Sequence, residues 1–411
     1  MSLEIHARQV TMRKALTVVL ISALLLISSA RAGQEEDAAQ PAPRHRFLNL
    51  SLYYPVSLNK SKSDTANLNL SLLYGHLGSV RGLDISLGAA AVERSLEGVQ
   101  LAGLIAVAGE SMKGGQAAGL FCVAGDRGEG VQLAGLGSVG GEEFSGVQVG
   151  GLFAVAGERL KGIQISGLFG VAGQSTMGFQ ASGLFSVAGD QLDGIQIAGL
   201  FNVAGEDSRA LQVAGLMNVT GGTCRGLQVG LFNVAGKLTG VQVGLVNAAD
   251  EIEGLPIGLV NLTRKEDRRI QMAAWAGSVS LFNAGVKIWA KRFYSILYAG
   301  VINLPQSVEG CLGYGFQYGY AFPLSASGES SGRKRIDIDA GYLYLDNSTL
   351  FRHLEGTPDR HVLSVRGSLV IELSPQVSLV GGIGLGYRID YGTGFSGGSL
   401  FPLAFAGVEL F

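Results

Sequence analysis

The chain has 411 residues, of which 63 are glycine, 16% are charged and 47% are hydrophobic, and its formal net charge is −2. The glycine share is about double the usual value of about 7%, whereas the charged share lies well below the usual value of about 25%. A disordered or nucleic-acid-binding protein would be rich in charge and poor in Val, Ile, Leu and Phe. The composition therefore excludes both classes, and nucleic acid is not an expected partner.

The first 32 residues have the three parts of a secretory signal peptide. A basic start at residues 12–14 precedes an apolar run over residues 15–27, and residues 30–32, Ala-Arg-Ala, form a small-x-small cleavage site. The apolar run is shorter than the about 20 residues that a membrane-spanning helix needs. We therefore expect an exported protein whose residues 33–45, rich in Gln, Glu, Ala and Pro, form a flexible leader.

Two amphipathic strands are expected next, within residues 46–76. Leucine alternates with Asn or Ser over residues 48–52 and again over residues 67–72, and the polar residues 59–66 lie between them. Period-two alternation is typical of a strand with one apolar face, and a short polar segment between two such strands is typical of a turn. The sequence therefore predicts an N-terminal β-hairpin.

A 16-residue repeat fills residues 77–263, and it reads approximately Gly-Val-Gln-Val-Ala-Gly-Leu-Phe-Asn-Val-Ala-Gly-Glu followed by three variable residues. The most regular column is glutamine, at Gln100, Gln116, Gln132, Gln148, Gln164, Gln180, Gln196, Gln212, Gln228 and Gln242, with Asp84 one period before the first and Pro256 after the last. A second column is asparagine, at Asn202, Asn218, Asn233, Asn247 and Asn261. Stacked amides can hydrogen-bond to their copies in the next repeat. We therefore expect structural ladders rather than a ligand site.

Each repeat holds two short β-prone segments, and two architectures fit them. A repeat is either one coil of a β-solenoid, with corners near Gly103 and Gly109, or one strand of a single large antiparallel barrel. From Gln228 onward the repeat loses one residue after the glutamine and another in its charged segment, whereas a deletion inside one long strand would turn all following side chains to the other face. The repeats also contain no Tyr, although membrane barrels carry aromatic girdles. These observations favour the solenoid and leave the large barrel as the alternative.

Residues 264–411 are different, because the repeats stop and Tyr becomes common. Eight alternating segments lie at 270–277, 280–289, 293–302, 311–322, 335–345, 361–373, 377–388 and 401–411. Most have about the length of a tilted strand that crosses a bilayer. The tyrosines expected to form interface girdles are Tyr294, Tyr298, Tyr314, Tyr318, Tyr320, Tyr342, Tyr344, Tyr387 and Tyr391. With the N-terminal hairpin the segments make ten strands, so we expect an antiparallel barrel with the solenoid inserted after its second strand; a soluble β-sandwich is the alternative.

Two resemblances add to this interpretation. The C-terminal part resembles bacterial outer-membrane β-barrel proteins, whose last strand typically ends in Phe with alternating apolar residues. Here Leu403 and Phe405 are in phase with the terminal Phe411, while Glu409 departs from the pattern. The repeat, as in GLQVGLFNVA at residues 226–235, is similar to that of an uncharacterised group of bacterial surface-repeat proteins. The resemblances imply an outer-membrane or cell-surface location and no particular activity.

The sequence holds only weak matches to catalytic and metal-binding motifs. The histidines show no metal-ligand spacing, and the Gly-x-Ser-x-Gly pattern at residues 394–398 is not followed by a helix, so we expect no catalytic residue, metal or cofactor. In a solenoid Cys122 and Cys224 lie too far apart to form a disulfide, and Cys311 is left over. An acidic column is interpreted as a solvated corner rather than a calcium site; its members are Glu110, Asp126, Glu142, Glu158, Asp190 and Glu206.

The function expected from the sequence is therefore that of a non-enzymatic envelope protein anchored in outer-membrane lipid. Its solenoid would be structural or would bind an unknown surface ligand. One alternative is an outer-membrane pore. Another is a secreted carbohydrate-active solenoid, in which case the protein would lie in the periplasm or outside the cell; such an enzyme would be expected to carry stacking aromatic residues, and the repeats contain no Tyr.

Overall fold

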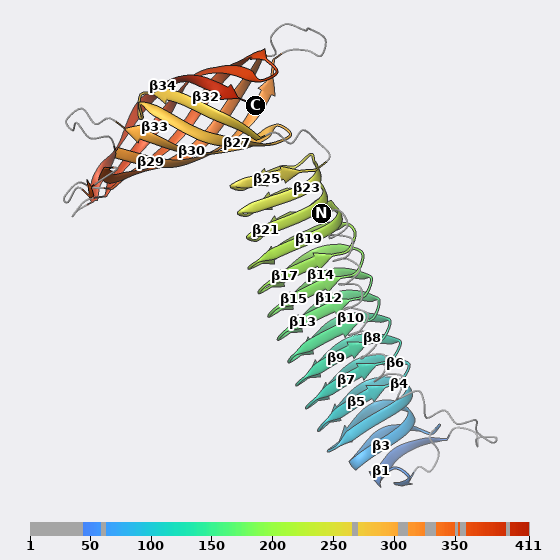
Figure 1. Cartoon of the computed structure of the whole chain (residues 1–411). Helices are drawn as coiled ribbons and strands as arrows, with labels where there is room; N and C mark the ends of the chain where they lie inside the picture. Colours follow the sequence, from blue (N-terminus) through green and yellow to red (C-terminus); the bar gives the residue numbers. More distant parts are fainter. Residues whose placement is uncertain are drawn as a thin grey trace. The chain divides into compact units, whose positions relative to one another are not determined.

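The structure is a computed structural model that describes residues 44–58, 63–264, 270–302, 311–324, 334–349, 352–353, 359–391 and 395–410. The expected signal peptide and nearly all of the expected leader lie outside these residues. The fold is all-β, with a parallel β-solenoid of about 13 turns and a separate closed antiparallel barrel of eight strands (Figure 1). No helix in the described ranges is long and apolar enough to cross a membrane. The chain divides into two compact units, Met1–Val219 and Thr220–Phe411.

The repeats are coils with two strands each, as the sequence favoured, so the single large barrel is wrong. The strands that carry the glutamine column and its predecessors are β3 (Thr65–Ser86), β4 (Ala89–Ala102), β6 (Ser111–Ala118), β8 (Arg127–Ala134), β10 (Glu143–Gly150), β12 (Arg159–Ser166), β14 (Ser175–Ser182), β16 (Leu192–Ala198), β18 (Ser208–Ala214), β20 (Leu227–Val229), β22 (Val241–Val243) and β24 (Leu255–Ile257). The second strands of the coils are β5 (Ile105–Ala108), β7 (Phe121–Ala124), β9 (Gly137–Gly140), β11 (Phe153–Ala156), β13 (Phe169–Ala172), β15 (Phe185–Ala188), β17 (Phe201–Ala204), β19 (Met217–Cys224), β21 (Phe232–Leu238), β23 (Val246–Ile252) and β25 (Val260–Thr263).

Successive coils pair in parallel with a shift of one repeat, so that Gln148 lies opposite Gln164. The two corners fall where the sequence predicts them, between β4 and β5 and between β5 and β6. Glycine is needed at the corner after the glutamine strand and also within that strand, two residues before the glutamine. A Cβ on Gly103 would lie 1.9 Å from the Leu87 carbonyl oxygen, and Gly98 has a φ of 136°. Residues other than glycine rarely adopt that backbone conformation.

The predicted N-terminal hairpin is wrong. Strand β1 (His45–Tyr53) pairs in parallel with β3, with Leu48 opposite Leu68, and its antiparallel partner is only the two-residue β2 (Val56–Ser57). Asn49 donates a buried 2.8 Å hydrogen bond to Asn69, as neighbouring coils do throughout the solenoid. Period-two alternation does not distinguish a parallel coil from an antiparallel hairpin, because both place side chains on alternate faces.

The interior of each coil in the first unit has two halves. Near the charged corner it is an apolar core, formed by side chains such as Leu96, Met112, Phe144 and Leu160. Near the opposite corner it is polar, because the column glutamines are fully buried there. The coil therefore buries hydrocarbon under its charged edge and amides under its uncharged edge.

The barrel consists of the eight C-terminal strands alone, so the expected ten-stranded barrel with an inserted solenoid is wrong. Its strands are β26 (Ile270–Gly277), β27 (Phe282–Ala290), β28 (Phe293–Ile302), β29 (Cys311–Pro323), β30 (Lys334–Thr349), β32 (Asp359–Ser374), β33 (Val377–Tyr391) and β34 (Phe395–Leu410), and the short β31 (Arg352–His353) pairs with the end of β30. Each strand pairs antiparallel with the next in this series, and pairing of β34 with β26 closes the barrel.

Candidate functional site in the barrel interior

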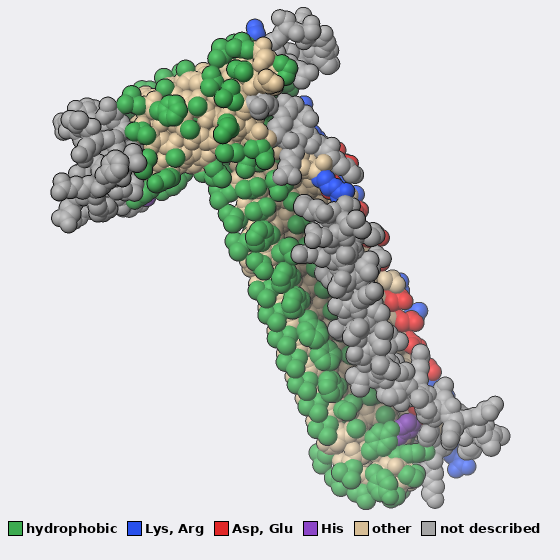
Figure 2. All heavy atoms as spheres, viewed as in Figure 1, with side chains coloured by type: hydrophobic (Ala, Val, Ile, Leu, Met, Phe, Trp, Pro, Cys, Tyr) green, Lys and Arg blue, Asp and Glu red, His purple; other side chains and the backbone are tan. Residues whose placement is uncertain are grey.

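The barrel has charged and polar side chains inside, together with some aromatic and aliphatic ones, and its exposed outer side chains are mainly apolar. Lys287 and Asp337 are each 1% exposed, whereas Ile383 is 73% exposed and Leu400 is 69% exposed. Figure 2 shows hydrophobic side chains over the visible outer surface of the barrel. A barrel in water would have the opposite arrangement, since apolar surface favours burial. The inward-facing groups are therefore the candidate functional site.

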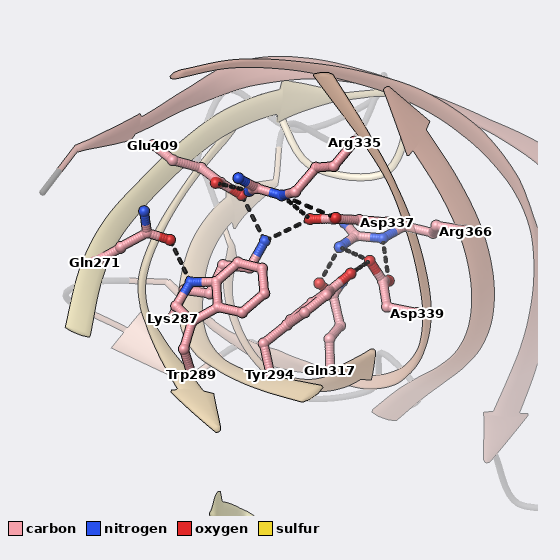
Figure 3. Close-up of polar contacts among 10 residues, drawn as sticks. All are labelled: Gln271, Lys287, Trp289, Tyr294, Gln317, Arg335, Asp337, Asp339, Arg366 and Glu409. Carbon is pink, nitrogen blue, oxygen red and sulfur yellow. Dashed lines mark hydrogen bonds and ion pairs between the residues drawn. The ribbon is translucent and has the colours of Figure 1, made fainter. Parts of the chain in front are cut away.

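Four charged side chains form the first cluster inside the barrel (Figure 3). Lys287 Nζ lies 2.7 Å from both Asp337 Oδ2 and Glu409 Oε1. Arg335 Nε lies 3.0 Å from Asp337 Oδ1, and its Nη2 also donates to Glu409. The residues come from β27, β30 and β34. Each carboxylate therefore contacts two cations, which offsets the cost of removing all four charges from water.

A second cluster lies beside the first in Figure 3 and is built around Asp339. Arg366 donates to both carboxylate oxygens, from Nε at 2.8 Å and from Nη2 at 3.2 Å, and the same Nη2 donates to Gln317. The Tyr294 hydroxyl donates to Asp339 Oδ2 at 3.0 Å. This two-point contact fixes the guanidinium plane, as paired arginine–carboxylate geometry usually does.

Aromatic rings complete the packing around the three cations. Lys287 Nζ lies 3.8 Å from the centre of the Tyr294 ring and 4.5 Å from that of Trp289. The Arg366 guanidinium lies 4.4 Å from the Phe405 ring. Cations over ring faces gain further electrostatic stabilisation, especially where water is absent.

The charged groups of the two clusters are engaged with one another. The two clusters hold three cations and three carboxylates, and every one of these carboxylates is engaged by a cation. The cavity beside them, lined by residues such as Trp275, Tyr298 and Arg366, measures about 40 Å³. That is room for about one water molecule. Eight strands enclose an interior that side chains can fill, and the two clusters occupy part of it.

No group of three or more His, Cys, Asp and Glu side chains within the described ranges is arranged to hold a metal ion. Ser396 of the Gly-x-Ser-x-Gly pattern lies within β34, and Gly394 lies outside the described residues. The charged corners of the solenoid hold exposed pairs between coils, such as Lys161 with Glu143 at 2.7 Å. Exposed pairs of this kind contribute little to stability.

The column glutamines lie inside the solenoid and bond to one another. Gln116, Gln132, Gln148, Gln164, Gln180, Gln196 and Gln212 each donate from Nε2 to Oε1 of the glutamine one coil before, at 2.8–3.0 Å. Gln242 donates to Gln228 in the same way at 2.8 Å. The Gln242 oxygen has no partner in the described part of the chain, since Pro256 occupies the next column position. The asparagine column runs in the other direction, and Asn202 donates to Asn218, Asn233 to Asn247 and Asn247 to Asn261, each at 2.9 Å.

Asp84 is the point at which two chains of amides meet. Gln100 donates to its Oδ2 at 3.0 Å from one side, and Asn69 donates to its Oδ1 at 2.6 Å from the other. A carboxylate can accept on both oxygens, whereas an amide offers only one acceptor atom. This explains why the glutamine column begins with an aspartate. Burial raises the pKa of Asp84, and the two hydrogen bonds oppose that shift.

Sequence reasoning missed the charged clusters in the barrel. Glu409 departs from the apolar pattern because it faces inward and contacts Lys287 and Arg335. Leu403 is in the same phase and also faces inward, with 7% exposure, whereas Leu410 faces outward. Tyr294, expected in a girdle, is 1% exposed and faces Asp339. The available signal was a single charge at an alternate position of an otherwise apolar strand, as at Lys287.

Comparisons with known proteins found no match to this chain among protein-family models, curated proteins or solved structures.

Proposed function

We propose that the protein is a non-enzymatic component of a bacterial cell envelope, and that its barrel anchors it in the lipid of the outer membrane. The observation that carries the proposal is the inverted barrel, with buried ion clusters inside and exposed apolar side chains outside. A membrane barrel has this arrangement, because lipid surrounds its outer face. The signal-like segment at residues 1–32 supports export of the chain.

The ion clusters inside the barrel support an anchor rather than a conducting pore. Both clusters cross the lumen between strands that are not sequence neighbours, such as β27 and β34. An open channel requires a continuous water path, which wider barrels provide. The solenoid then acts as the part that the anchor presents, either as a structural element or as a surface for a ligand.

Cell fractionation tests the anchor. We expect the full chain in the outer-membrane fraction, with faster gel migration when unboiled than when boiled. The variant Ile383→Arg should reduce the folded, fast-migrating form, because a charge on the lipid face of a barrel costs about 2–4 kcal/mol near mid-bilayer. Ile383→Leu is the matched control. Recovery of the unaltered chain in the soluble fraction without heat-dependent migration would contradict the proposal.

A planar-bilayer recording tests the pore alternative. The unaltered chain should give no stable open-channel current. Steady conductance that persists in purified samples would favour transport over anchoring.

A further inference from the structure

The outside of the solenoid is divided into a charged edge and an uncharged remainder. In the eleven repeats from residue 99 to residue 263, the stretch from the residue before the column position to the fourth residue of the second strand contains no Lys, Arg, Asp, Glu or His. All charges of these repeats fall in the segment between one such stretch and the next, as Lys113 and Glu129 do. Figure 2 shows the result, with charged side chains along one edge of the coils and hydrophobic side chains on the visible side away from it.

The uncharged part of the exterior is apolar rather than merely neutral. The side chains on either side of the column glutamine point outward. Val99 is 42% exposed, Leu101 is 40% exposed and Ile165 is 43% exposed. The leucine at the corner of each coil is at least partly exposed, and Leu104 and Leu152 reach 51% and 43%. Repetition over successive coils makes one continuous patch. Contiguous exposed apolar patches mark sites of contact with a partner or a membrane.

From Gln100 to Gln196, the column glutamines beneath this patch have both their amide nitrogen and their amide oxygen hydrogen-bonded. The glutamines bond to each other and also donate to backbone carbonyls across the coil, as Gln148 does to Val155 at 3.0 Å. The strand backbones bond to the coils on either side. Over these coils the patch can therefore leave water without leaving the column amides unpaired, which is a condition that a hydrocarbon environment imposes.

Two shallow grooves on the same exterior are lined almost entirely by apolar groups. One, of about 550 Å³, is lined by residues such as Leu87, Leu101 and Leu133. The other, of about 640 Å³, is lined by residues such as Leu52 and Leu72, and Ile85 lines both. Neither lining contains a charged side chain.

We propose that the uncharged edge of the solenoid docks on the acyl chains of a lipid surface, with the charged edge in water. Charge complementarity argues for this occupant, because an amphipathic element with one charged and one apolar side matches the boundary between water and lipid. A protein or glycan partner would be expected to meet polar groups that fix its orientation, and this edge presents none from its side chains. The inference concerns the solenoid and goes beyond the barrel anchor, so each can fail without the other.

Site-directed fluorescence on the full chain tests the inference. In a background of Cys122→Ala, Cys224→Ala and Cys311→Ala, single cysteines are placed at Leu104→Cys and Glu110→Cys, which lie at the two edges of one coil, and labelled with bimane. Leu200→Cys and Glu206→Cys provide a second matched pair. The labelled chains are reconstituted into phosphatidylcholine–phosphatidylglycerol vesicles that contain a nitroxide-labelled lipid, or are exposed to aqueous iodide.

We expect nitroxide lipid to quench the Leu104→Cys and Leu200→Cys probes several-fold more than the Glu110→Cys and Glu206→Cys probes, and iodide to give the reverse order. Equal iodide quenching at both edges would overturn the inference. So would a leucine-edge probe shielded from both quenchers, which would indicate a second copy or another protein surface as the occupant. A probe at Ile383→Cys on the barrel separates the two proposals, because lipid quenching there without quenching at Leu104→Cys leaves the anchor standing and removes the solenoid contact.

Discussion

The solenoid and the barrel both bury polar groups under apolar surface, but they satisfy those groups differently. The solenoid stacks identical neutral amides, whereas the barrel pairs unlike charges. A repeat places each side chain beside a copy of itself, and an amide can bond to its copy because it carries both a donor and an acceptor. A charge beside its own copy would be repelled. Buried ion pairs therefore require different residues at facing positions, which the barrel strands have and the glutamine column lacks.

Asp84 is an exception to the stacking of identical side chains in the solenoid. It is the one carboxylate in the glutamine column, and it lies between two donors rather than between two carboxylates. Its position marks the change from the irregular first coils to the regular ones. In both interiors, the neighbouring side chain decides which polar residue can be buried at a position. Substitutions can therefore test the amide ladder and the ion clusters separately.

The largest effect is expected from Lys287→Met in the barrel. The change leaves Asp337 and Glu409 buried with Arg335 as their shared cation. Removal of one partner from a buried ion cluster typically costs about 3–5 kcal/mol. Urea unfolding of the reconstituted barrel measures this loss.

The double variant Lys287→Met with Glu409→Gln restores the balance of charge in the same cluster. It should recover part of the lost stability, which distinguishes a charge effect from a packing effect. Equal losses in the single and double variants would show that charge pairing contributes little inside this barrel.

A smaller effect is expected from Gln164→Leu in the solenoid. The variant leaves the Gln148 oxygen and the Gln180 amide without their ladder partners. A buried polar group deprived of its partner costs about 1–3 kcal/mol. Hydrogen exchange should increase most in the coils next to residue 164, because solenoid stability depends mainly on neighbouring repeats.

The outward substitution Ile163→Val in the same strand is the matched control and should leave exchange nearly unchanged. Uniform destabilisation of all coils by Gln164→Leu would argue against a local ladder contribution.

The regular parts of the molecule were predictable from sequence, and the unique contacts were not. A period of 16 with losses at two places indicates coils with two corners, and eight alternating segments indicate the barrel strands. The pairing direction of β1 was missed, because alternation is the same in parallel and antiparallel strands. The ion clusters were missed because their partners are far apart in sequence, as Lys287 and Glu409 are, and only barrel closure brings them together.

The next effect concerns Asp84, the carboxylate in the glutamine column. Asp84→Asn places an N–H group toward Gln100 or Asn69, each of which already donates there, so we expect a loss of about 1–2 kcal/mol. The pH dependence should change as well. Burial raises the pKa of Asp84, so the folded state holds this proton more tightly than the unfolded state does. The contribution to stability is therefore greatest below the ordinary carboxyl pKa and is lost as the pH rises through the folded-state pKa.

Urea unfolding between pH 3 and pH 8 measures this slope in the unaltered chain and in Asp84→Asn, and the variant should lack the Asp84 contribution. Identical slopes would mean that Asp84 does not titrate differently in the folded state.

The smallest effect tests whether the interior of the solenoid excludes water. Cys122 occupies the position that later repeats give to asparagine, and its Sγ lies 3.2 Å from the Leu133 carbonyl oxygen. Burial raises the pKa of Cys122 to about 12, so very little thiolate exists at pH 8. We expect maleimide to modify Cys122 at least about 1,000-fold more slowly in the folded chain than in urea, since each pKa unit lowers the thiolate fraction about tenfold. Mass spectrometry of the peptide that contains Cys122 measures both rates. Modification of the folded chain at the rate seen in urea would show that water reaches the ladder, and the amides would then be hydrated rather than bonded mainly to their copies.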